Sequence, residues 1–171
     1  MHVISNNAAY IIRRINEIWG KSPGKKTLQK MVFLIEQKGI GLNYDYGLHF
    51  YGPYSAALDA ATAFLSADGV VEFDYSGRSH RMSIADGYGV SSAGLSATQE
   101  KEIDDIITRF RGRSPSELEL LTTAIYAFNN LEDKTIESVI NGVLKIKGAK
   151  YSPAEIRQAL DDFAYFNKAF Q

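Results

Sequence analysis

The stretch LHFYGPYSAALDAATAFL, residues 48–65, joins a short aromatic turn to a helical pattern of apolar residues. In the turn, Gly52 permits a positive φ and Pro53 fixes its own φ. Apolar residues follow Ser55 at helical spacing, so we predict that its side chain caps a helix over residues 55–66. This helix contains Asp59 and no Lys or Arg. Its buried stripe is expected to contain Leu58, Ala61, Phe64 and Leu65.

Two more helices and a hairpin are predicted around this stretch. Helical periodicity covers residues 5–19 and 26–38, and a glycine follows each run. After Gly69 the period changes to two on both sides of the loop SGRSHR, which predicts a β-hairpin. Three helices followed by a hairpin is the order of a winged helix, whose third helix usually enters the DNA major groove. We therefore predict a winged-helix-like core over residues 1–90.

The second half of the chain carries clear helix start signals. Ser96, Ser114 and Ser152 each stand three residues before Gln or Glu, which is the pattern of a capping box. A further apolar run covers residues 134–146, and the stretch GYGVSSAG before Ser96 is interpreted as a linker. The sequence thus predicts a mostly α protein of the α+β class, with a C-terminal helical subdomain over residues 91–171 packed on the core.

The composition is that of an ordinary globular protein. The 171 residues are 45% hydrophobic and 23% charged, with a net charge of −1, so there is no global basic field to attract nucleic acid. The sequence contains no cysteine, which excludes disulfides and thiolate nucleophiles. Because no apolar run approaches the length of a membrane span and the N-terminus does not resemble a secretion signal, we expect a cytoplasmic protein without membrane contact.

The sequence gives little support for catalysis or metal binding. The three histidines, His2, His49 and His80, are far apart and lack the spacing of a metal-binding motif. The adjacent acids of the predicted helices point about 100° apart and cannot share a proton. We therefore expect no enzymatic activity, no metal and no cofactor. A hydrolase or nucleic-acid-processing enzyme with a site built from dispersed acids is the least favoured alternative.

Three motifs carry a resemblance to known families. They are LQKMVFLIEQKG (28–39), HFYGPYSAAL (49–58) and ELELLTTAIYAF (117–128). Together they resemble the uncharacterised prokaryotic YwgA-like family and, more distantly, the Panacea (SocA-like) antitoxin domains. The first resemblance implies a fold without an established activity. The second implies neutralisation of toxin proteins, with no catalytic residues, although YGPYS departs from the turn expected of Panacea domains.

The helix after the turn fits contact with protein better than contact with DNA. Small side chains on an exposed helix face allow another surface to approach closely, although the same alanines could pack against the C-terminal helices. We expect a non-enzymatic regulatory or protein-interaction module. The resemblance to Panacea domains implies one form of it, an antitoxin-like protein whose partner is a toxin. A homodimer is compatible with the sequence. The residues expected to bind a protein partner are Tyr51, Pro53, Tyr54, Leu58 and Asp59.

The main alternative is a winged-helix transcriptional regulator that binds DNA. Basic residues gather at the start of the second helix and at the hairpin tip, where phosphate contacts would be made. Because the third helix offers no side chain for a bidentate base contact, such binding is expected to be weak. The residues expected to contact nucleic acid in this alternative are Lys25, Lys26, Lys30, Arg78 and Arg81.

Overall fold

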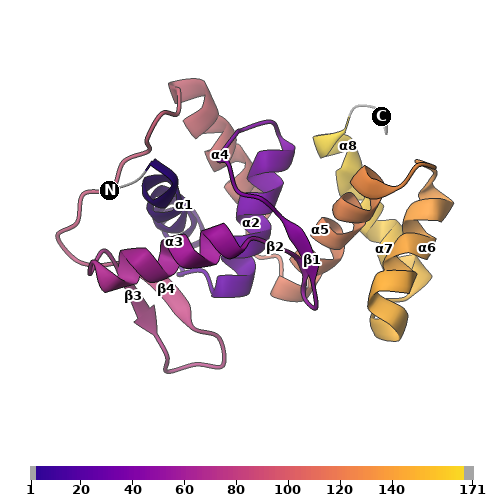
Figure 1. The fold of residues 1–171 in the computed structure, drawn as a ribbon, viewed down its shortest axis with the longest axis horizontal. Helices are drawn as coiled ribbons and strands as arrows, with labels where there is room; N and C mark the ends of the chain where they lie inside the picture. Colours follow the sequence, from indigo (N-terminus) through magenta and orange to yellow (C-terminus); the bar gives the residue numbers. More distant parts are fainter. Residues whose placement is uncertain (1–2, 168–171) are drawn as a thin grey trace. The chain divides into compact units, whose positions relative to one another are not determined.

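The computed structural model describes residues 3–167 (Figure 1), so His2 lies outside the described residues. The chain is mostly helical with two small two-stranded sheets, which confirms the predicted class of mostly α with some β. It divides into an N-terminal unit, Met1–Gly47 with Tyr54–Arg113, and a C-terminal unit, Leu48–Pro53 with Ser114–Gln171. No helix in the described part of the chain is long and apolar enough to cross a membrane.

The N-terminal unit contains four longer helices and an antiparallel hairpin. Its helices are α1 (Val3–Trp19), α2 (Lys25–Gln37), α3 (Ala56–Ala67) and α4 (Ala97–Arg109), and its hairpin is β3 (Val71–Asp74) with β4 (Arg81–Ile84). Helix α1 packs against α3, α4 and β4. Its apolar residues recur every three or four positions, which places one side of the helix in the core. The most deeply buried of these are Ala8, Ile11, Ile12 and Ile15.

The hairpin β3–β4 confirms the predicted change to a two-residue period after Gly69. Val71 pairs with Ile84 and Phe73 with Met82 in an antiparallel register. The loop before α2 joins the same hairpin, because Gly24 forms a bridge with Arg81. The order of three helices and a hairpin is therefore present, while its description as a winged helix stays a prediction.

The C-terminal unit is built around α5 (Pro115–Asn130). This helix packs against α6 (Ile136–Lys147) and α7 (Pro153–Ala159), which also pack on each other. The capping boxes predicted at Ser96, Ser114 and Ser152 are all present, and each fixes the start of a helix. The remaining elements are η1 (Gly148–Lys150), η2 (Leu160–Asp162) and α8 (Phe163–Phe166).

The observed units differ from the predicted ranges of 1–90 and 91–171. Helix α4 packs on α1 and α2, and the second unit begins at Ser114. The apolar stripe of α4 predicted a buried face but could not indicate which helices would cover it. The short hairpin of β1 (Gly47–His49) and β2 (Gly52–Tyr54) also departs from the linear division, because its residues Leu48–Pro53 group with the C-terminal unit.

Candidate functional site

The aromatic turn is held at its end by a glutamine of α2. Gln29 is 5% exposed, and its Oε1 accepts a hydrogen bond of 2.8 Å from the backbone N–H of Ser55. Its Nε2 donates one of 2.9 Å to the backbone carbonyl of the same residue. Ser55 in turn caps α3, because its Oγ accepts from the backbone N–H of Leu58 at 3.3 Å. We call this pair of bonds the Gln29 clamp; it links the first two motifs of the sequence physically.

The segment that leads into the turn is also fixed to α2. Tyr44 is buried, and its backbone N–H donates to Glu36 Oε1 at 3.0 Å. Burial raises the pKa of the Glu36 carboxyl above its ordinary value. Two residues later, the ring of Tyr46 meets Phe33 edge to face, with ring centroids 5.1 Å apart. The segment that precedes the hairpin β1–β2 is therefore packed against α2.

The exposed face of α3 is made almost entirely of small residues. Phe64 is 62% exposed, so its predicted place in the buried stripe is wrong, whereas Leu58, Ala61 and Leu65 are buried as predicted. This face carries no Lys or Arg. Such a surface offers no cation for phosphate and no side chain for bidentate base recognition. Its other exposed members are Ala56, Ala57, Ala60, Ala63 and Ala67.

The tip of the hairpin β1–β2 presents large apolar side chains to solvent. Phe50 is 83% exposed, Tyr51 55% and Leu48 39%. The rings of Phe50 and Tyr51 meet edge to face, with centroids 4.9 Å apart and planes at 88°. We call these three residues the aromatic tip. An exposed aromatic cluster of this kind is typical of a surface that another molecule covers.

A buried ion pair in the C-terminal unit fixes the backbone of the aromatic tip. Glu119 of α5 is fully buried, and its Oε1 lies 2.8 Å from Lys147 Nζ. The side chain of Lys147 is 4% exposed, and its Nζ also donates to the backbone carbonyl of Phe50 at 2.7 Å. One ammonium group therefore links a buried carboxylate of α5 to the tip.

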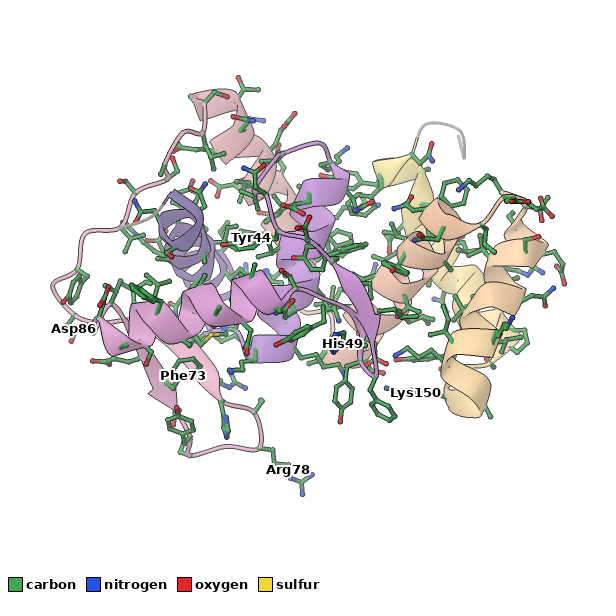
Figure 2. All side chains as sticks on the ribbon, viewed as in Figure 1. Tyr44, His49, Phe73, Arg78, Asp86 and Lys150 are labelled. Atoms are coloured by element: carbon green, nitrogen blue, oxygen red, sulfur yellow. The ribbon has the colours of Figure 1, made fainter. Side chains whose placement is uncertain are left out.

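A second lysine reaches the same carboxylate from the surface. Lys150 Nζ donates to Glu119 Oε1 at 2.7 Å and lies 5.8 Å from the centroid of the Tyr51 ring, within range of a cation–π contact. The hydrogen bond to Glu119 raises the pKa of Lys150. Figure 2 shows Lys150 and His49 at this part of the C-terminal unit. The aromatic tip is thus accompanied by an ammonium group whose charged form is stabilised by Glu119.

The five residues predicted to bind a partner are placed in different environments. Tyr51 is exposed and Tyr54 is half-buried. Asp59 pairs with Lys25 at 3.0 Å. Pro53 and Leu58 are buried, so they support the turn and the core of α3 and do not present a surface to a partner. Phe50 was not predicted from the sequence. Neither were Lys147 at the end of α6 and Lys150 in η1, because no local pattern indicates which segment they contact.

The five residues predicted for nucleic acid are only partly brought together. Lys25 is near the hairpin, with its Nζ 5.7 Å from the Phe73 ring centroid, but it pairs with Asp59. Arg81 is exposed and pairs in register with Asp74, and Arg78 extends from the hairpin loop (Figure 2). Lys26 is half-buried. Lys30 is 2% exposed, so the prediction that it contacts a phosphate is wrong in this structure.

An open pocket of about 480 Å³ lies in the N-terminal unit, between α1, α4 and the linker that precedes α4. Each charged side chain that lines it has a hydrogen-bond or ion-pair partner. Arg14 makes two hydrogen bonds of 2.8 Å to the carboxylate of Asp104, and Arg13 donates to the carbonyl of Val90 at 2.8 Å. Burial, and secondarily the charge of Glu100, raises the pKa of Tyr10 in the same pocket. Together with the hydrogen bond from the hydroxyl of Ser92 to Glu100, this arrangement fastens the linker to the helices.

Within residues 3–167, no group of three or more His, Asp or Glu side chains is arranged to hold a metal ion. His49 and His80 belong to different units. The absence of a metal and of a cofactor stays a prediction.

Comparison with known proteins identifies a relative without an assigned function. No family model matches the chain. The chain is similar to "Uncharacterized protein YwgA" of Bacillus subtilis (strain 168), with 29% identity over 153 residues that cover 82% of this chain and 85% of that protein. This similarity over most of both lengths supports the YwgA-like relationship predicted from the motifs. The more distant similarity to Panacea domains stays a prediction.

The Gln29 clamp predicts that Gln29→Glu destabilises the N-terminal unit. A carboxylate can still accept from the N–H of Ser55 but cannot donate to its carbonyl, so a buried acceptor loses its partner, at a cost of about 1 to 3 kcal/mol. Urea denaturation followed by the fluorescence of Trp19, the sole tryptophan of the chain, measures this unit. The exposed Gln158→Glu on α7 is the control and should change little. Equal stability of both variants would contradict the clamp.

The placement of the basic residues predicts weak DNA binding without sequence preference. Fluorescence anisotropy with random and promoter duplexes at about 150 mM salt should give similar, weak affinities, because α3 offers no bidentate base contact. Residual binding should fall steeply with salt and with Arg78→Ala, whereas Arg157→Ala, an exposed arginine of the C-terminal unit, should have no effect. Tight binding to one sequence, lost on Arg78→Ala or Arg81→Ala, would establish the DNA-regulator alternative.

Proposed function

We propose that this protein is a non-enzymatic regulatory module that acts by binding another protein through the aromatic tip. The observation that supports this most strongly is the 83% exposure of Phe50 beside the half-exposed Tyr51. Complete burial of one such side chain contributes about 2 kcal/mol to association. An isolated apolar residue on a surface is ordinary, but two rings at the tip of one hairpin form an anchor.

The way in which the tip is held supports the same proposal. Lys147 binds the carbonyl of Phe50, and the Gln29 clamp fixes Ser55 at the end of the turn. A segment that is already ordered loses less conformational entropy when it binds. The exposed alanine face of α3 is a second candidate surface in the N-terminal unit, because its small side chains permit close approach of a partner.

The antitoxin-like form of this proposal rests on the motif resemblance to Panacea domains, and in that form the partner is a toxin. The DNA-regulator alternative has one favourable observation. The bridge between Gly24 and Arg81 places the start of α2, with Lys25, beside the hairpin that carries Arg78. We favour the protein-binding function because Lys25 is paired with Asp59 and α3 lacks cations.

Site-specific photo-crosslinking in the native host tests the proposal. A benzoylphenylalanine introduced at Phe50 should give a discrete protein adduct, which mass spectrometry identifies. The same group at Tyr75, an aromatic residue that is 65% exposed in the N-terminal unit, is the matched control and should not give that adduct. Binding of the purified partner should then weaken at least tenfold on Phe50→Ser. Identical adducts at both positions, or adducts with nucleic acid alone, would refute the proposal.

A further inference from the structure

The aromatic tip lies in segments of the chain that lack acidic residues. Neither residues 46–58, which include the tip, nor residues 138–154, which include its two lysines, contain Asp or Glu. The acidic group that contacts these lysines is Glu119, which comes from α5 and is fully buried. The negative charge of this cluster is therefore enclosed, while a positive charge reaches the surface.

The cluster carries one positive charge in excess. Lys147 and Lys150 share the single carboxylate of Glu119. Lys147 is not available to solvent, since its side chain is 4% exposed and it also binds the carbonyl of Phe50. Lys150 has a side chain that is 39% exposed and an ammonium group beside the Tyr51 ring. Solvent thus meets an aromatic surface with one cation at its edge.

We infer that the aromatic tip recognises an acidic segment of a partner protein, in which an apolar side chain packs on Phe50 and Tyr51 and an adjacent carboxylate pairs with Lys150. This inference rests on the proposed function and specifies its ligand. An apolar contact supplies most of the affinity, and the charge pair selects which segments bind. A basic segment would place a like charge beside Lys150 and is disfavoured.

A single-stranded nucleic acid is the competing ligand, because bases also stack on exposed aromatic rings. Such ligands need a basic groove that follows their backbone. The C-terminal unit, Leu48–Pro53 and Ser114–Gln171, contains eight acidic residues against six Lys and Arg, a net charge of −2. A long polyanion would be repelled by this unit, whereas a short acidic segment can meet Lys150 locally.

Selection from a displayed library of random 12-residue peptides, with the intact protein as target, tests the inference. The selected peptides should be enriched in Asp or Glu next to Phe, Leu or Trp. Their affinities are measured by fluorescence anisotropy at about 50 and about 300 mM salt, a range in which exposed charge pairs become screened. A 20-residue thymidine oligonucleotide serves as the nucleic-acid probe and should bind much more weakly.

Three variants separate the contributions. Phe50→Ser should weaken peptide binding at least tenfold. Lys150→Gln should weaken it about fivefold and remove most of the salt dependence, while Glu119 keeps Lys147 as its partner. Lys145→Gln, a neighbouring exposed lysine of α6, is the matched control and should stay within about twofold of the wild type.

The outcomes distinguish this inference from the proposed function. Peptides that depend on Phe50 but are not acidic, or that ignore Lys150→Gln, would overturn the inference and leave the protein-binding function standing. Failure to select any peptide whose binding depends on Phe50 would also overturn the inference. Tight binding of the oligonucleotide that is lost on Phe50→Ser would overturn both.

Discussion

The ion pair between Glu119 and Lys147 is the interaction on which the exposed part of the C-terminal unit depends. Both side chains are almost completely removed from water, which is costly unless the two charges are paired. Here Lys150 adds a second cation to the carboxylate, and the carbonyl of Phe50 accepts from Lys147. An apolar pair of similar volume could fill the same space, but it could not hold a backbone carbonyl in place. We interpret the pair as a device that positions the aromatic tip.

In the N-terminal unit, a neutral buried side chain fixes the backbone in a similar way. Gln29 is buried in α2 and uses both ends of its amide to satisfy the backbone of Ser55. Its two hydrogen bonds, to the N–H and the C=O of one residue, replace those that a neighbouring β-strand would make. Ser55 then starts α3 in a fixed direction, because its hydroxyl is committed to the cap. Buried polar side chains thus fix the hairpin residue Phe50 within one unit and the helix start at Ser55 within the other.

Local chemistry made much of the fold predictable. The caps at Ser55, Ser96, Ser114 and Ser152 are confirmed because a capping residue and its partner are only three positions apart. The hairpin after Gly69 is confirmed because alternation is also a local signal. These signals need no knowledge of which elements meet in space. They therefore predict which helices and strands exist, but not how these elements pack on one another.

The candidate site was less predictable because it depends on contacts between distant residues. Lys30 belongs to a polar pattern at the start of a helix, yet it is 2% exposed. Phe64 fits an apolar stripe by its spacing, yet it is 62% exposed. Lys147 and Phe50 are 97 positions apart, and no pattern in either segment indicates the other. Tyr51 was identified from the chemistry of its turn, whereas Phe50 required the structure.

Hydrogen–deuterium exchange of the segment that carries the aromatic tip tests the central claim most directly. The claim is that Lys147, held by Glu119, keeps the backbone around Phe50 ordered. Lys147→Met keeps the length of the side chain and removes its ammonium, while Glu119 retains Lys150. We predict that the amides of residues 48–52 exchange at least tenfold faster in this variant than in Lys145→Met, with α5 unchanged in both. Equal exchange of residues 48–52 in the two variants would contradict the claim that the buried ion pair positions the tip.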